Sequence, residues 1–310
     1  MKILIAGAGA VGGVVGAALL GGGREVTFLV RPARAERLRE RGLRVATGED
    51  TQVLRPDAVT ADRLEGPYDL VLLAVKAAAL AQVTDDLAPA VGPGTAIVPF
   101  LNGMAHMDAL TGRFGTAVLG GTLKVAAQLG DDGTVVLMAP GIRIEVGELD
   151  GADTPRLGTV VAALDVPGIE VHGRSDIVDA MWAKWVFIAA VGAVTSLMRA
   201  PVGDVVAVPG GTRFAEAVLD EIAGVARASG HRVAAADLAA TGAVLTAPGS
   251  PTTSSLARDL VAGRPTEVDS VLGDLCDRAR DLGAPVPLTE AATLALRVHD
   301  QRVAGPGQPA

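Results

Sequence analysis

Cysteine, histidine, aromatic residues and positive charge are all scarce in this chain of 310 residues. The one cysteine, Cys276, excludes an internal disulfide framework, and the four histidines lack the spacing of metal ligands. Lys and Arg number 27 against 35 Asp and Glu, which gives a net charge of −8. An acidic chain without a basic cluster is poorly suited to nucleic acid. The sequence therefore predicts a cytoplasmic protein with no metal and no nucleic-acid partner.

A charge-free stretch near the N-terminus, Ile3–Gly23, has the length of a signal peptide or a membrane span. Eight of its 21 residues are glycine, and each glycine costs a helix about 1 kcal/mol relative to alanine. A second uncharged run, Trp185–Met198, is too short to span a bilayer. We therefore expect neither a signal peptide nor a membrane partner.

The first half of the chain alternates short apolar runs with helical stretches such as Ala10–Leu20 and Ala78–Ala88. Continuous apolar runs are typical of parallel strands that are buried on both faces. This alternation predicts a doubly wound parallel sheet. A hairpin formed by Thr134–Met138 and Arg143–Gly147 would close the domain. The expected strands are Lys2–Ala6, Glu25–Val30, Leu70–Val75, Thr95–Phe100 and Val118–Thr122.

The second half of the chain has helical periodicity throughout. The predicted fold class is thus α/β, with an N-terminal Rossmann-type doubly wound parallel sheet over residues 1–174 and an all-α helical domain over 175–302. Residues 303–310, rich in glycine and proline, would form a frayed tail. Apolar helices such as Ala234–Leu245 could either form the interface of a homodimer or pack within the chain. A long helix capped by Ser175 or Asp176 is expected to run to about Met198. The other expected helices are Thr212–Ser229, Ala234–Leu245, Ser254–Ala262, Pro265–Leu282 and Thr289–Asp300.

A glycine-rich turn follows the first expected strand and opens the first expected helix. In this context the first glycine makes the tight turn, the second lets a pyrophosphate approach the backbone, and the third permits close packing of the helix on the strand. The helix N-terminus adds unpaired N–H groups and partial positive charge. The turn predicts a dinucleotide-binding site formed by Gly7, Ala8, Gly9, Ala10, Val11 and Gly12.

The end of the second expected strand indicates which dinucleotide binds. An NAD enzyme usually has a carboxylate there, bonded to the ribose 2′-hydroxyl. This chain has Arg31 instead, followed by Arg34, and guanidinium groups bind a 2′-phosphate. The predicted cofactor is therefore NADP(H). Lys76 and Asn102 follow the next two strands at the carboxyl edge of the sheet, where cofactor and substrate would bind.

Lys184 lies in a helix that is apolar on nearly all sides. Such a lysine either extends its ammonium to water or is buried for a purpose, for instance to donate a proton to a substrate carbonyl. Glu267 near the start of a helix would favour the helix dipole, and Ser254 or Ser255 would cap another helix. These residue types taken alone leave structural roles open.

Together these motifs resemble the ketopantoate reductase family (2-dehydropantoate 2-reductase) over nearly the whole chain. The resemblance implies an enzyme that uses NADPH to reduce a 2-keto acid, 2-dehydropantoate, to pantoate in pantothenate and coenzyme A biosynthesis. The matching residues are Gly7-x-Gly9-x-x-Gly12, Lys76, Leu101-Asn102-Gly103-Met104, Lys184, and Ser254-Ser255-Leu256-x-x-Asp259 with Gly263-Arg264-Pro265-Thr266-Glu267-Val268-Asp269.

The same resemblance implies a role for each matched side chain. Lys184 and Glu267 would be the catalytic residues: Lys184 would be the general acid, and Glu267 would orient the substrate and Lys184 by hydrogen bonds. Ser255 would contact the substrate, and Asn102 would lie between substrate and nicotinamide. Lys76 and Arg31 would help to bind the cofactor.

The chain also departs from the family at positions that are expected to contact the substrate. Many members have asparagines at the positions of Ile188, Gly192 and Thr252, so Ile188 and Thr252 are candidate substrate-binding residues of altered chemistry. An unpaired polar group on the substrate costs about 1–3 kcal/mol. A first alternative is therefore reduction of a less polar 2-keto acid or ketone, which Trp182, Trp185 and Ile188 would suit. A second alternative is a non-enzymatic NADP(H) sensor, which would need neither Lys184 nor Glu267.

Overall fold

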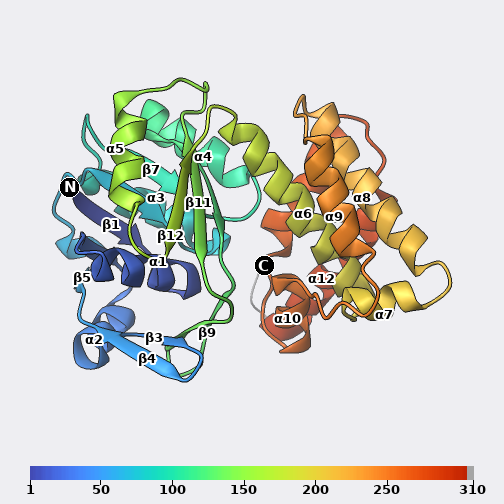
Figure 1. Ribbon diagram of the computed structural model, residues 1–310, viewed down its shortest axis with the longest axis horizontal. Helices are drawn as coiled ribbons and strands as arrows, with labels where there is room; N and C mark the ends of the chain where they lie inside the picture. The colour runs from blue at the N-terminus through green and yellow to red at the C-terminus, as the bar shows by residue number, and fades with distance from the viewer. Residues whose placement is uncertain (306–310) are drawn as a thin grey trace. The chain divides into compact units, whose positions relative to one another are not determined.

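The computed structural model describes residues 1–305, which separate into two compact units. Unit 1 comprises residues 1–101 and 106–178, and unit 2 comprises residues 102–105 and those from 179 onward. Figure 1 follows the chain from the N-terminal strands to the C-terminal helices. The predicted fold class is confirmed, since a parallel-sheet α/β domain precedes a helical region. The predicted boundary at residue 174 stays a prediction.

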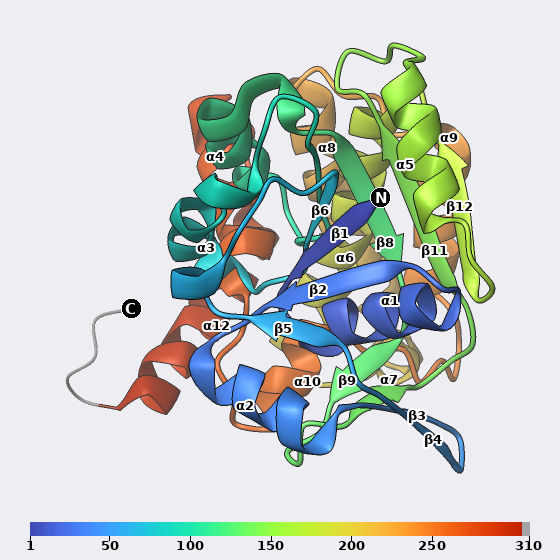
Figure 2. The same cartoon turned by 90° about the vertical axis from the view of Figure 1, so that its left-hand side faces the viewer.

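Unit 1 is built on a five-stranded sheet in which every pair of neighbours is parallel. β1 lies in the middle, with β2 on one side and β6 on the other (Figure 2), so the strand order reverses at β1. Ligands of open α/β sheets bind beyond the carboxyl ends of the strands at such a point. The order is β5 (Asp57–Val59), β2 (Glu25–Leu29), β1 (Lys2–Ala6), β6 (Leu70–Leu73) and β7 (Ala96–Pro99).

Helix α1 (Ala10–Gly21) explains the glycine-rich stretch near the N-terminus. A Cβ on Gly16 would lie 2.2 Å from the ring of Phe28 in β2, and one on Gly13 would lie 2.7 Å from Val135 in β10. The glycines thus let α1 pack tightly between the parallel sheet and a second sheet. That second sheet has the order β4 (Asp50–Leu54), β3 (Leu43–Thr47), β10 (Val135–Leu137) and β9 (Ala127–Leu129).

A third sheet, in the order β12 (Ile169–Gly173), β11 (Ile142–Gly147) and β8 (Gly120–Lys124), corrects two predictions. The expected hairpin is wrong, because β10 pairs with β3 and β9 whereas β11 pairs with β8 and β12. The turn at Gly141 therefore carries the chain from one sheet to another. The strand expected at Val118–Thr122 lies two residues later and joins this third sheet antiparallel to β11, leaving only Val118 bridged to Ile97.

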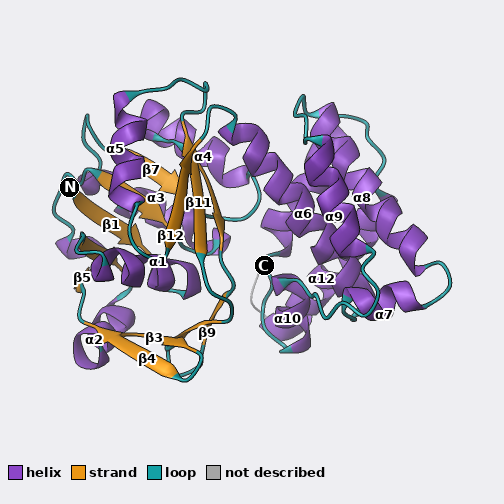
Figure 3. Cartoon of the chain, viewed as in Figure 1, coloured by secondary structure: helices purple, strands orange, loops and turns teal. Residues whose placement is uncertain are grey.

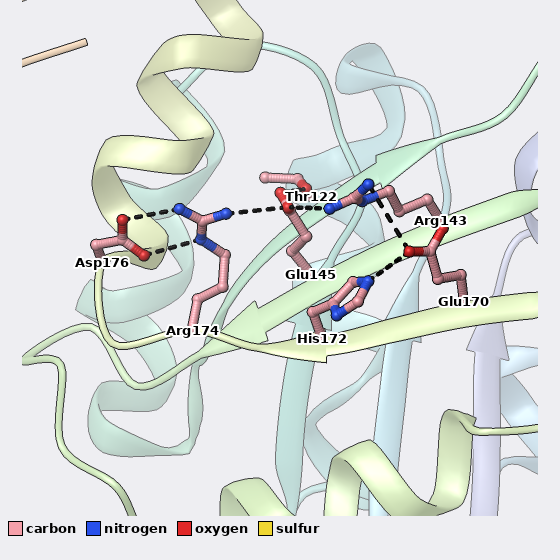
Figure 4. Close-up of polar contacts among 7 residues, drawn as sticks. All are labelled: Thr122, Arg143, Glu145, Glu170, His172, Arg174 and Asp176. Atoms are coloured by element: carbon pink, nitrogen blue, oxygen red, sulfur yellow. Dashed lines mark hydrogen bonds and ion pairs between the residues drawn. The ribbon is translucent and has the colours of Figure 1, made fainter. Parts of the chain in front are cut away.

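A polar network ties the third sheet to the segment that follows β12 (Figure 4). Glu145 is 6% exposed and accepts hydrogen bonds from Thr122 at 2.9 Å and Arg174 at 3.1 Å. Arg174 also donates two bonds to Asp176, at 2.8 and 2.7 Å. This pair raises the pKa of Arg174 and lowers the pKa of Asp176. The chain is thus bonded to unit 1 where it leaves β12.

Unit 2 is helical (Figure 3). Its α6 (Ile177–Met198) is long and apolar enough to cross a membrane by composition alone, but 61% of its most apolar window is buried within the protein. The helix expected over Pro265–Leu282 instead begins at Val268 and opens with a π-helical turn, Asp269–Gly273. The final helix reaches Ala304, past its predicted end at Asp300, and residues 306–310 of the predicted tail lie outside the described residues.

The remaining helices complete the two units. Those from residue 32 to 164 are α2 (Pro32–Arg41), α3 (Leu80–Asp86), α4 (Ala105–Phe114) and α5 (Pro155–Leu164). Those of unit 2 are α7 (Val202–Ala207), α8 (Gly211–Ala228), α9 (Ala235–Leu245), α10 (Ser255–Val261), α11 (Asp274–Asp281) and α12 (Pro287–Ala304).

We expect Glu148→Gln to destabilise unit 1. Glu148 is 6% exposed and bonds to Arg156 and, at 2.5 Å, to Thr154, the N-cap of α5. Burial raises the pKa of the Glu148 carboxyl, but the bonds from Arg156 and Thr154 outweigh burial and hold the pKa below 4.5. At about pH 7 the substitution should cost about 1–3 kcal/mol.

The pH dependence of that cost follows from the direction of the pKa shift. A lowered carboxyl pKa stabilises the fold above pH 4.5, and this stabilisation is lost as the pH falls through the folded-state value. Urea unfolding followed by circular dichroism should therefore show the two proteins converging below pH 4.5. A difference that stays constant into acid would contradict the assignment.

Candidate active site

The glycine turn has a different steric requirement at each glycine. Gly7 has φ +100°, and a Cβ on Gly12 would lie 2.0 Å from the Gly7 carbonyl oxygen. A Cβ on Gly9 would meet no protein atom within 4 Å. Gly9 is also the N-cap of α1 and supplies no side-chain bond to its first N–H groups. The open space at Gly9 and these N–H groups fit a dinucleotide phosphate.

The two arginines after β2 have different surroundings. Arg34 donates to the carbonyl of Ala8 at 2.8 Å and to that of Gly133 at 3.3 Å. Burial and then the neighbouring Arg37 lower the pKa of Arg34. Arg31 is exposed at the N-cap of α2. Arg34 thus holds the glycine turn, a role that sequence spacing does not reveal, while Arg31 is exposed where a phosphate could reach it.

Lys76 lies on unit 1 at the same edge of the sheet as the glycine turn. It is exposed and precedes a short 3₁₀ turn after β6. The chain just before it touches the turn, because a Cβ on Gly7 would lie 2.8 Å from the Ala74 carbonyl oxygen. Unit 1 therefore holds three of the predicted cofactor elements: the glycine turn, Arg31 and Lys76.

The other predicted site residues belong to unit 2, Asn102 among them. Asn102 is half-buried and precedes Gly103, which has φ +81°. A Cβ on Gly103 would lie 2.0 Å from the Ser270 carbonyl oxygen. The loop of Asn102 therefore packs directly on the π-helical turn that follows Glu267.

Trp185, the residue after Lys184 in α6, is bonded to the same π-helical turn. Both Lys184 and Glu267 are half-buried. The indole N–H of Trp185 donates to the carbonyl of Val271 at 2.8 Å. The structure thus brings the segments of Asn102, Lys184 and Glu267 to one π-helical turn. Helical π turns occur often at functional sites.

The two indoles beside Lys184 pack inside unit 2. Trp182 and Trp185 are 2% and 1% exposed, with ring centroids 4.8 Å apart. Trp182 also stacks on His231 at 4.8 Å. Ile188, one turn after Lys184, is only half-buried. Of the three apolar residues suggested for substrate contact, Ile188 is thus the accessible one.

Ser254 and Ser255 have different surroundings at the start of α10. Ser254 is the N-cap, accepts the Ala257 N–H at 2.9 Å and lies 3.0 Å from the Thr195 hydroxyl. Ser255 is exposed as the first helical residue. The Thr252 hydroxyl accepts a bond from Ser250 at 2.9 Å. Ser255 therefore remains the serine available to a ligand, whereas Thr252 is already bonded within its loop.

Two remaining observations concern metal and thiol chemistry. Within residues 1–305, no group of three His, Cys, Asp or Glu side chains could hold a metal ion. Cys276 is buried 3.4 Å from the Thr293 hydroxyl, and burial raises the pKa of its thiol. A raised thiol pKa disfavours the nucleophilic thiolate.

We expect Gly9→Ala and Gly12→Ala to separate binding from folding. The Cβ at position 12 would displace the Gly7 backbone, so this variant should lose several degrees of Tm. The Cβ at position 9 meets no protein atom, so this variant should keep its Tm and lose dinucleotide affinity by about tenfold or more. Thermal melts with and without NADPH measure both. Equal affinity in Gly9→Ala and the parent would contradict the phosphate site.

Two family models match most of this chain. Residues 3–151 match the family model described as Ketopantoate reductase PanE/ApbA, and residues 176–300 match that of its C terminal part. The uncharacterized oxidoreductase YkpB of Bacillus subtilis is 32% identical over 97% of this chain and 99% of its own length. The 2-dehydropantoate 2-reductase of Halobacterium salinarum is 31% identical over 93% of this chain and 95% of its own length.

Solved structures of related proteins have the same fold as this chain. A PanE/ApbA family ketopantoate reductase from Ralstonia eutropha superposes with a TM-score of 0.87 at 25% identity, covering 98% of this chain and 100% of that one. A D-mandelate dehydrogenase, solved with NADH and anilino(oxo)acetate, shares the fold with a TM-score of 0.88 at 20% identity, covering 98% and 100%. The predictions of family and of an oxidoreductase are confirmed: the chain belongs to the ketopantoate reductase PanE/ApbA family, whose members use a nicotinamide cofactor.

Proposed function

We propose that this protein reduces 2-dehydropantoate to pantoate with NADPH and serves pantothenate biosynthesis. The observation that carries the proposal is the meeting of the Asn102, Lys184 and Glu267 segments at one π-helical turn of unit 2. The family supports the substrate, since several relatives bear the name 2-dehydropantoate 2-reductase.

Two sets of residues divide the work. The glycine turn from Gly7 to Gly12, Arg31, Lys76 and Asn102 would hold the cofactor. Bound there, the nicotinamide supplies the hydride that adds to the 2-keto carbon. The Lys184 ammonium donates a hydrogen bond to the keto oxygen and passes its proton from Nζ to that oxygen, which leaves a hydroxyl. Ser255 and Glu267 hold the substrate in position for this transfer.

The preference for NADPH rests on Arg31. A 2′-phosphate needs an exposed cation at this position, and Arg31 is exposed whereas Arg34 is bonded to two carbonyls. The N-terminus of α2 adds partial positive charge beside Arg31.

A second candidate substrate is a 2-keto acid with an apolar side chain. Ile188, where the resemblance to the family implies an asparagine, is half-buried. At Gly192 a Cβ would lie 3.0 Å from Leu256, so α6 and α10 meet there through an apolar side chain. The D-mandelate dehydrogenase with the same fold was solved with an aryl-bearing keto acid analogue. These features favour a substrate such as phenylglyoxylate.

Replacing Lys184 tests the reaction. Loss of NADPH absorbance with 2-dehydropantoate should report turnover in the parent, and Lys184→Ala should lower kcat by about 100- to 10,000-fold, the usual contribution of a general acid. Lys124→Ala, which removes an exposed lysine from β8, should leave kcat unchanged. Phenylglyoxylate measured in parallel decides between the two substrates by kcat/KM. Full activity in Lys184→Ala would exclude this lysine as the acid.

Replacing Arg31 tests the cofactor. Arg31→Gln removes a charge-assisted hydrogen bond to phosphate, so KM for NADPH should rise about tenfold or more while KM for NADH stays the same. Arg41→Gln, at the other end of α2, is the matched control and should change neither constant. An equal rise for both cofactors in Arg31→Gln would show that Arg31 does not read the 2′-phosphate.

A further inference from the structure

Trp185 is buried beside Lys184 in α6 and is held from several sides. It is 1% exposed. The Trp182 ring lies 4.8 Å away, and the guanidinium carbon of Arg278 lies 5.8 Å from the Trp185 ring centroid. With the ring so fixed, its N–H has one direction, toward the Val271 carbonyl 2.8 Å away.

The acceptor belongs to the π-helical turn. The Asp274 N–H bonds to the carbonyl of Asp269, five residues earlier. A turn of this kind inserts one residue into a helix and displaces the carbonyls of the widened turn from their α-helical positions. Its geometry is less favourable than that of a regular helix, so neighbouring contacts must hold it. Trp185 supplies such a contact.

The π-helical turn is in turn bonded to Glu267. The Glu267 carbonyl accepts the Val271 N–H at 3.2 Å and the Ser270 hydroxyl at 3.1 Å. Val271 therefore links Glu267, through its N–H, to Trp185, through its carbonyl. Gly103 packs against the Ser270 carbonyl, so the loop of Asn102 rests on the same turn.

We infer that Trp185 is a positioning residue, whose indole N–H holds the π-helical turn and thereby fixes Glu267 relative to Lys184. The inference rests on the proposed function, in which these two side chains serve one substrate. Catalytic groups must be held to within about 0.5 Å, and a misplacement of about 1 Å can cost about 100-fold in rate. A flexible link between Glu267 and α6 would not meet that requirement.

Trp185→Phe tests the inference, because it keeps an aromatic ring and removes the N–H donor. We expect kcat for the preferred 2-keto acid to fall about 10- to 100-fold while KM for NADPH stays constant. Phe187→Leu changes an exposed aromatic residue of the same helix and leaves the rings around Trp185 and its bond to Val271 in place, so its kcat should fall less than about threefold.

A double-mutant cycle with Glu267→Gln separates positioning from general packing. If Trp185 acts through Glu267, the Trp185→Phe change should have almost no further effect on kcat in the Glu267→Gln background. Two effects that simply multiply would overturn the inference. Lys184→Ala measured alongside shows whether the proposed function itself fails, since that variant would then keep its activity.

Hydrogen exchange tests, without any substrate, whether Trp185 holds the π-helical turn. In Trp185→Phe the amides of residues 268–275 should exchange faster than in the parent, whereas those of β1 should be unchanged. Unchanged exchange at 268–275 would overturn the inference even if no 2-keto acid were turned over.

Discussion

The backbone of Gly12 lies so close to the carbonyl of Gly7 that no side chain fits between them, and the cofactor half of the proposed site depends on that contact. It holds the N-terminus of α1 at the carboxyl end of β1, where the strand order reverses. Gly13 and Gly16 extend the same principle along α1, which touches Val135 on one side and Phe28 on the other. The Arg34 guanidinium also holds the glycine turn, because it donates a hydrogen bond to the carbonyl of Ala8. In the proposed site, unit 1 would thus present the N–H groups of α1 to the pyrophosphate.

Unit 2 meets a different requirement, because it must support charged side chains from an almost wholly apolar helix. Trp185 follows Lys184 directly, and its indole N–H donates a hydrogen bond to the π-helical turn. Glu267 and the loop of Asn102 are attached to that turn through backbone atoms, at Val271 and Ser270. The reactive groups can therefore be held by main-chain geometry, which tolerates less movement than long side chains.

Much of the fold could be predicted from the sequence because its signals are local. The buried strands β1, β2, β6 and β7 are largely apolar runs, and α1 begins directly after a glycine turn. Strand partners are not local, which is why β10 and β11 were wrongly expected to pair with each other. Each finds a partner far along the chain, β10 with β3 and β11 with β12.

The site could be predicted in part for the same reason. Motif spacing identified the glycine turn, Lys184 and Glu267 as candidates, but it could not distinguish Arg31 from Arg34, since only the fold places Arg34 against a carbonyl. The stretch from Pro265 to Leu282 has continuous helical periodicity, so nothing in it indicated a π-helical turn. Trp185 was named from the sequence only as a residue that would suit a less polar substrate, and the structure shows its indole N–H bonded to the backbone of its own unit.

The most direct test of this account is isotope transfer. Wild-type protein would be given 2-dehydropantoate and NADPH carrying deuterium at C4 of the nicotinamide, on each face in separate reactions, and the product would be analysed by mass spectrometry. The account predicts pantoate with one deuterium at C2 from one of the two labelled cofactors, and almost none when Lys184→Ala replaces the parent. Pantoate without deuterium from either cofactor, or no pantoate despite tight NADPH binding, would contradict it.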